Sequence, residues 1–180
     1  MTSGVLLAAG AGRRYGLPKI LVPGWLVGAV TTLRDGGCDD VVVVTGAARP
    51  ALPTGCREVH CPTWELGMGA SLRAGLEATA TADRVVIHLV DLPDVGADVV
   101  RRVLGRSTEG PARAVYGGRP GHPVALPHHH VALLLAELEP ATGAAGFLRR
   151  QDVVEVECGD LVTGEDVDSR PDGGPVGHGR

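Results

Sequence analysis

The apolar positions in the N-terminal part of the chain follow two patterns, continuous runs and recurrence at helical spacing. Continuous runs of branched apolar side chains predict strands that are buried on both faces. Apolar residues that recur at helical spacing predict amphipathic helices between those runs. The predicted strands cover residues 5–9, 41–44 and 84–90, and the predicted helices cover residues 25–33, 68–80 and 98–104. Because strands that alternate with helices are typical of a parallel sheet, we predict a Rossmann-like α/β sandwich of three layers with a mostly parallel sheet.

The remainder of the chain carries shorter elements. Strands are predicted at residues 112–116 and 123–126, a helix at residues 131–138 and a last strand at residues 153–156. The chain has 180 residues, a length that suits one domain. Residues after Pro171 are rich in glycine and proline, so we expect one domain over residues 1–170 and a disordered tail over residues 171–180.

Composition narrows the classes of partner. The formal net charge is -4 and aromatic residues make up 3% of the chain, which argues against nucleic acid as a partner. No segment approaches the ~20 apolar residues of a membrane span. No basic stretch precedes the first apolar run, as a secretory signal would require. We therefore expect a cytoplasmic protein that binds neither nucleic acid nor membrane.

The loop that follows the first predicted strand, residues 10–18, is rich in glycine and arginine. Glycines let the backbone approach a ligand closely and direct its N–H groups at phosphate. The arginines and Lys19 add positive charge that suits a polyphosphate. Lys19 is the only lysine in an arginine-rich chain, which favours a position that requires a compact ammonium group. The loop therefore predicts a phosphate-binding site.

Two well-known glycine-rich loops do not fit this segment. A dinucleotide-binding turn requires a third glycine, where Tyr15 stands, and an acidic residue after the second strand, where Thr45 and Gly46 stand. A Walker A loop requires serine or threonine after its lysine, but Lys19 is followed by Ile20.

The loop sequence Leu-Ala-Ala-Gly-x-Gly-x-Arg, followed by Gly-x-x-Lys, resembles the signature of the sugar-nucleotide and molybdopterin nucleotidyltransferases. The resemblance is closest to the MocA-like molybdenum cofactor cytidylyltransferases and their MobA-related relatives. Further segments are similar to motifs of that group, and they occur in the same order: Trp64–Leu72, Leu89–Pro93, Gly118–Val124 and Asp166–Ser169. An ordered set of motifs is far more specific than one glycine loop.

The resemblance implies a nucleotidyltransferase in which an acceptor phosphate attacks the α-phosphate of a nucleoside triphosphate and pyrophosphate leaves. Mg2+ is the implied cofactor. CTP or GTP is the implied nucleotide, and the acceptor is a small phosphate-bearing molecule, with transfer of CMP to molybdopterin as the specific expectation. The implied nucleotide-binding residues are Leu7, Ala8, Ala9, Gly10, Gly12, Arg13, Lys19, Gly69 and Ser71.

Three residues receive catalytic roles from the resemblance. Arg13 is expected to bind the β- and γ-phosphates, and Lys19 is expected to stabilise charge at the α-phosphate. Asp91 is expected to bind Mg2+, because a hard cation prefers carboxylate oxygen. Arg14, the neighbour of Arg13, is expected to be a solvated loop residue.

The remaining site residues come from the C-terminal half. Pro93 cannot continue a strand, so Asp91 is expected at the carboxyl end of its strand, where ligands of such sheets bind. Asp168 is the expected second metal ligand, with Asp166 as the alternative, because residues two apart in an extended segment point the same way. His122 is expected to lie near the acceptor.

The chain departs from the resembled pattern on the acceptor side. Residues 22–25 form a compressed turn, and the segment Ala141–Phe147 lacks the aspartate and arginine of the family's Gly-Asp-x-Gly-Ala-Arg element. Two other functions therefore stay open. One is a nicotinamide-dependent oxidoreductase of the nicotine-blue type, and the other is a relative that binds nucleotide without catalysis.

Overall fold

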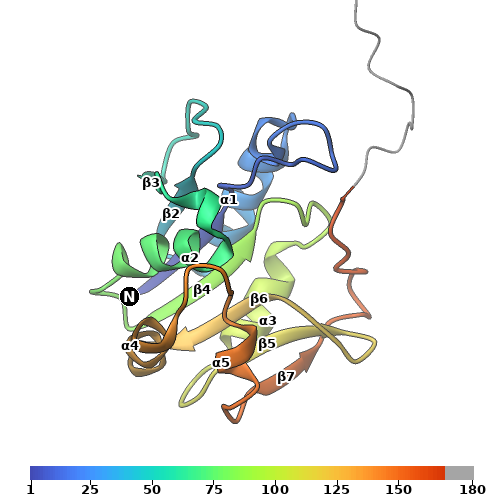
Figure 1. Ribbon diagram of the computed structural model, residues 1–180. Coiled ribbons are helices and arrows are strands. Elements are labelled where there is room, and N and C mark those ends of the chain that lie inside the picture. The colour runs from blue at the N-terminus through green and yellow to red at the C-terminus, as the bar shows by residue number, and fades with distance from the viewer. Residues whose placement is uncertain (169–180) are drawn as a thin grey trace, which may run out of the picture.

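A computed structural model describes residues 1–168 (Figure 1). Within those residues, seven strands form one sheet in the order β3-β2-β1-β4-β6-β5-β7. Helices cover both faces of that sheet, so the predicted three-layer α/β sandwich is confirmed. The predicted domain boundary at residue 170 and the predicted tail over residues 171–180 lie outside the described residues.

The elements follow one another in the expected alternation. The strands are β1 (Thr2–Leu7), β2 (Asp40–Thr45), β3 (Arg57–His60), β4 (Arg84–Leu89), β5 (Ala112–Tyr116), β6 (Arg119–Pro127) and β7 (Val154–Glu157). The helices are α1 (Trp25–Asp35), α2 (Met68–Glu77), α3 (Ala97–Leu104), α4 (His128–Glu137) and α5 (Ala145–Leu148). Two short 3-10 segments, η1 (Lys19–Leu21) and η2 (Trp64–Leu66), precede α1 and α2.

The strand β1 lies inside the sheet, where it pairs in parallel with β2 on one side and with β4, the middle strand, on the other. β3 is parallel to β2 and β7 is parallel to β5, whereas β6 is antiparallel to both β4 and β5. Leu7 at the end of β1 lies opposite Leu89 at the end of β4. The loops that follow these two strands therefore leave the same edge of the sheet.

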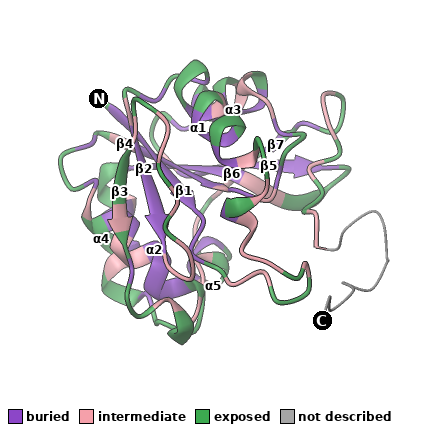
Figure 2. Ribbon diagram, turned by 90° about the horizontal axis from the view of Figure 1, so that it is seen from above, coloured by how far each residue is buried: buried purple, intermediate pink, exposed green. Residues whose placement is uncertain are grey.

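Alternate residues of the buried strands pack against different helical layers, as the pleat of a strand requires. Leu6 faces the layer of α1 and α3, where it belongs to one core cluster with Leu33 and Val99. Val5 faces the layer of α2, α4 and α5, where Leu76 lies in the second cluster. Figure 2 shows the two helical layers on opposite sides of a buried sheet. No helix among residues 1–168 combines the length and apolar character that a membrane span needs.

The first strand begins earlier and ends earlier than the predicted residues 5–9. Thr2, Ser3 and Gly4 are buried and pair with β4, although they are not part of an apolar run. A Cβ atom at Gly4 would lie 3.1 Å from the Cδ1 atom of Leu33 in α1. The small residue therefore permits close packing between helix and strand, a need that a search for apolar runs does not detect.

Two other elements differ from the prediction because the residues that it left out form no apolar run. β3 was not predicted, because three of its four residues are exposed and it pairs only with β2 at the edge of the sheet. β6 begins at Arg119 rather than residue 123, since its first residues form a hairpin in which Arg119 pairs with Tyr116.

Candidate active site

A cleft of about 540 Å3 lies where β1 and β4 end. Such crevices at the carboxyl ends of parallel strands are the usual ligand sites of open α/β sheets. Of the residues predicted from the sequence, those that line the cleft are Leu7, Ala8, Ala9, Gly10, Gly12, Arg13, Lys19, Ser71, Asp91, Asp166 and Asp168. The loop after β1, the start of α2, the end of β4 and the C-terminal segment therefore meet at one site.

The glycine loop is held in a fixed shape at both ends. At its start, Ala47 N donates to Ala9 O at 2.9 Å, which ties the loop to the end of β2. Gly12 has a φ of 59°, and a Cβ atom there would lie 1.9 Å from the carbonyl oxygen of Leu17. Gly16 N closes the turn by donating to Gly12 O at 2.8 Å. Glycine is therefore required at position 12, where the chain folds back on itself.

Lys19 opens η1 and extends to the end of β4. Its Nζ donates to Asp91 Oδ2 at 2.7 Å and to Asp168 Oδ1 at 2.9 Å. Burial alone would lower the pKa of Lys19, but the hydrogen bonds to the two carboxylates outweigh burial and raise it. The hydrogen bond from Lys19 in turn lowers the pKa of Asp168. Both pKa changes favour the charged forms of Lys19 and Asp168.

Three carboxylates come together around this contact. Asp91, Asp166 and Asp168 each offer an oxygen atom, and these atoms lie within 4.8 Å of one another. Val167 N donates to Asp91 O at 3.1 Å, which holds the C-terminal segment against the end of β4. A set of carboxylate oxygens at this spacing fits a hard divalent cation such as Mg2+. The structure thus places both Asp168 and its alternative, Asp166, beside Asp91.

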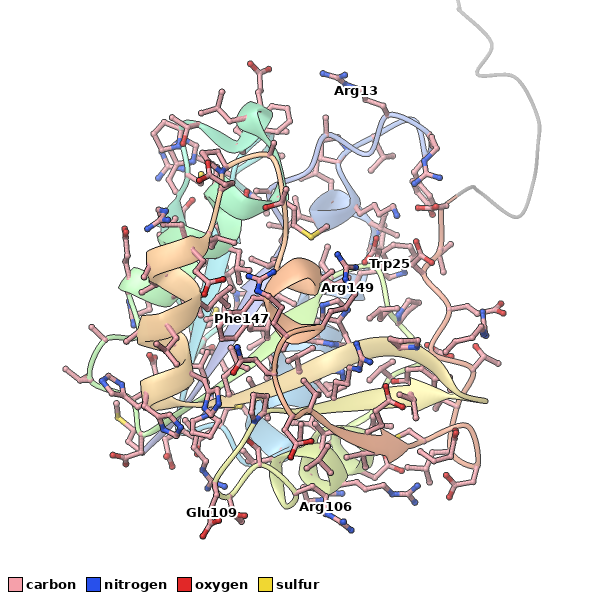
Figure 3. All side chains as sticks on the ribbon, turned by 60° about the horizontal axis from the view of Figure 1, so that its bottom comes forward. Arg13, Trp25, Arg106, Glu109, Phe147 and Arg149 are labelled. Carbon is pink, nitrogen blue, oxygen red and sulfur yellow. The ribbon has the colours of Figure 1, made fainter. Side chains whose placement is uncertain are left out.

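The two loop arginines both line the cleft, but they differ in their ionic partners. Arg14 Nη1 lies 2.7 Å from Asp168 Oδ2, so Arg14 is part of the charged cluster. Arg13 projects outward from the glycine loop (Figure 3), and within residues 1–168 it forms no ion pair. The motif itself indicated Arg14 as the functional arginine, because its arginine stands two positions after the second glycine, Gly12. A role for Arg13 in binding phosphate stays a prediction.

Gly69 lies at the start of α2 but does not line the cleft. A Cβ atom there would lie 2.0 Å from Glu139 O and 2.1 Å from Thr142 O. Ala70 N donates to Pro140 O at 3.1 Å, so the segment after α4 crosses directly over this glycine. The glycine therefore serves close backbone packing, and a nucleotide contact at Gly69 stays a prediction.

We expect Gly69→Ala to destabilise the fold by about 1–3 kcal/mol, because the new methyl group would overlap backbone atoms that cannot move freely. Thermal unfolding should show a lower Tm. The matched control is Gly10→Ala, since a Cβ atom at Gly10 would meet nothing within 4 Å. An unchanged Tm for Gly69→Ala would contradict the packing described here.

His122 is half-buried and does not line the cleft. Its imidazole lies close enough to Asp91 for an electrostatic interaction with that carboxylate. Burial lowers the pKa of His122 to about 4, and the charge of Asp91 opposes that change only in part. Its backbone carbonyl accepts a hydrogen bond of 2.6 Å from the hydroxyl of Tyr116. A contact with the acceptor stays a prediction.

A second histidine near the site, His88 on β4, was missed by the sequence analysis. It is fully buried, and neither ring nitrogen has a hydrogen-bond partner among residues 1–168. Burial lowers the pKa of His88 to about 3. The apolar run around His88 indicated a buried position, but nothing in the sequence indicates that its ring nitrogens lack hydrogen-bond partners.

We expect His88→Leu to reduce the sensitivity of the protein to acid. The unfolded-state pKa of histidine is about 6.5, so between that pH and about 3 the unfolded chain binds more protons than the folded one. Stability is thus fully present above pH 6.5 and is lost as the pH falls through this window. Denaturant unfolding at pH 8 and pH 5 measures the difference, with exposed His129→Gln as control. Equal pH dependence in His88→Leu and the wild type would contradict this assignment.

The chain is similar to several known proteins. The profile of the MobA-like NTP transferase domain family matches residues 4–156. The nicotine blue oxidoreductase of Paenarthrobacter nicotinovorans is 35% identical over 93% of this chain and 92% of its own length. The molybdenum cofactor cytidylyltransferase of Escherichia coli (strain K12) is 26% identical over 67% of each chain.

A solved structure shares the architecture. Rv0371c from Mycobacterium tuberculosis H37Rv aligns with a TM-score of 0.72 at 28% identity, over 93% of each chain. A complex of Rv0371c with manganese aligns with a TM-score of 0.65 at 25% identity, over 87% of this chain and 88% of that one.

Proposed function

Because the chain belongs to the MobA-like NTP transferase family, we propose that it transfers a nucleoside monophosphate to a phosphate-bearing acceptor and releases pyrophosphate. Mg2+ is the proposed cofactor, and CMP from CTP is the proposed group, with GTP as the other candidate nucleotide. The observation that carries the proposal is the contact of Lys19 with Asp91 and Asp168 at the mouth of the glycine loop.

The proposed roles follow from where the charged groups lie. Backbone N–H groups of the glycine loop, together with Arg14, which lines the cleft, would bind the triphosphate. The Nζ atom of Lys19 would stabilise the charge that develops on the α-phosphate. Asp91, Asp168 and Asp166 would hold Mg2+, which supplies charge neutralisation for the phosphates when bound. Most of the catalytic effect would then come from positioning and electrostatics.

The acceptor would approach from the side of His122, near Asp91. Molybdopterin is the proposed acceptor, supported by the E. coli relative that bears this activity in its name. The segment Ala141–Phe147 lacks the aspartate and arginine of the family motif, so recognition of the acceptor would depend on other groups.

A second candidate function is a nicotinamide-dependent oxidoreductase. The 35% identity to nicotine blue oxidoreductase over 93% of the chain favours it. Two residues oppose it: Tyr15 stands where a dinucleotide turn has glycine, and Thr45 stands where an acid would bind the ribose.

A panel of thermal-shift measurements separates the two functions. The ligands are CTP, GTP, ATP, UTP and NADPH, each with and without Mg2+. A ligand at a hundredfold excess over its Kd adds roughly 2.7 kcal/mol, which raises the Tm by several degrees. We expect Mg2+-dependent stabilisation by one triphosphate. Stabilisation by NADPH alone would support the oxidoreductase, and the absence of any shift would contradict both functions.

A further inference from the structure

In the cleft, the positively charged side chain of Lys19 lies between two candidate metal ligands, Asp91 and Asp168. The ammonium of Lys19 bridges Asp91 Oδ2 and Asp168 Oδ1 at 2.7 and 2.9 Å. The side chains of Lys19 and Asp91 are only 14% and 19% exposed, so water screens this contact weakly. The attraction between Lys19 and the two carboxylates is therefore stronger than in an ion pair at the surface.

A divalent metal that binds these two oxygens cannot share them with the ammonium. Mg2+ binds carboxylate oxygen at about 2.0–2.1 Å, so a metal on both oxygens would lie close to the position of Lys19 Nζ. Repulsion between the two cations would then be strong in a half-buried site. The other oxygen of Asp168, Oδ2, is already paired with Arg14 at 2.7 Å.

We propose that Lys19 competes with divalent metal for Asp91 and Asp168, so that this pair binds its metal as a metal–polyphosphate complex in preference to the free ion. The inference rests on the proposed function for the identity of the polyphosphate. Free metal would displace the ammonium and leave a half-buried charge without a counter-ion, which is costly. A polyphosphate supplies anionic oxygens beside the glycine loop, so Lys19 exchanges one anionic partner for another.

The consequence is positive coupling between the two ligands. When polyphosphate binds, it draws Lys19 away from the carboxylates, and metal then binds them more tightly. By linkage, metal tightens the binding of polyphosphate by the same factor. Lys19 has two arrangements, one paired with the carboxylates and one paired with polyphosphate. Metal and polyphosphate both favour the second arrangement.

The test measures Mn2+ binding to the full chain without any phosphate, by loss of the free-ion signal in electron paramagnetic resonance. We expect Lys19→Met to bind Mn2+ at least tenfold more tightly than the wild type, which corresponds to about 1.4 kcal/mol. Lys19→Gln, a second uncharged variant, should behave in the same way. Lys19→Arg keeps the charge and should bind Mn2+ as weakly as the wild type.

Two controls locate the effect. Arg13→Met removes a positive charge that also lines the cleft but has no carboxylate partner among residues 1–168, and it should leave the Mn2+ affinity within about twofold. Adding Asp91→Asn to Lys19→Met should remove the tight Mn2+ site, because Asp91 is one of the two ligands in question.

The outcomes for the inference and for the proposed function are distinguishable. If both uncharged variants bind Mn2+ no more tightly than the wild type, or bind none, the competition is overturned, even where Mg2+ and CTP together still stabilise the wild type. If those variants bind Mn2+ more tightly while no triphosphate stabilises the wild type, the competition is supported and the transferase proposal is contradicted.

Discussion

Asp91→Asn should lower kcat/KM for nucleotidyl transfer by at least about a thousandfold, or about 4 kcal/mol of transition-state stabilisation. Asp91 follows directly after the central part of the sheet, so its position is set by backbone pairing rather than by a mobile loop. Asparagine keeps the shape and one oxygen but removes the negative charge that a divalent cation requires. Pyrophosphate release from CTP, measured across a Mg2+ titration, gives the result.

The control for Asp91→Asn is Asp160→Asn. Asp160 is exposed and pairs with Arg102, and it does not line the cleft. The control should keep full turnover and its normal dependence on Mg2+. An Asp91→Asn variant that Mg2+ still stimulates would place the metal elsewhere in the protein.

Lys19→Met should lower kcat by about a hundredfold to a thousandfold, in line with the loss of one preorganised group that stabilises developing charge. The same variant should bind free Mn2+ more tightly, so the two measurements should move in opposite directions. Steady-state rates at saturating CTP and Mg2+, with unfolding curves to show an intact fold, provide the measurement.

Lys19→Arg tests the chemical reason for the only lysine of the chain. A guanidinium keeps the charge but is planar and larger, so we expect it to restore little of the rate. Full activity in Lys19→Arg would show that charge alone is sufficient, and near-normal turnover in Lys19→Met would remove the catalytic role altogether.

The core strands and the position of the cleft could be predicted from the sequence because their signals are local. Residues 41–44 are β-branched and fully buried, so their run of apolar side chains marks a strand with helices on both faces. Asp91 could be predicted because a proline two residues later ends the strand.

Which charged residues meet in the cleft could be predicted only in part. The motif spacing places its arginine at Arg14, whereas the different partners of Arg13 and Arg14 follow from the turn at Gly12, where φ is 59°. The approach of Asp166 and Asp168 depends on a segment distant in sequence, which Asp94 helps to hold by accepting hydrogen bonds from Thr163. Such contacts leave no periodic pattern, because a docked segment of extended chain needs neither helix nor strand.

The interior position of β1 in the sheet has a consequence for how the chain folds during synthesis. β1 is hydrogen-bonded to β2 on one side and to β4 on the other, but β4 follows β1 only after two helices and two strands. A nascent chain therefore cannot pair both edges of β1 until residue 89 has left the ribosome. During that interval one edge of β1 stays open to chaperones and to neighbouring nascent chains.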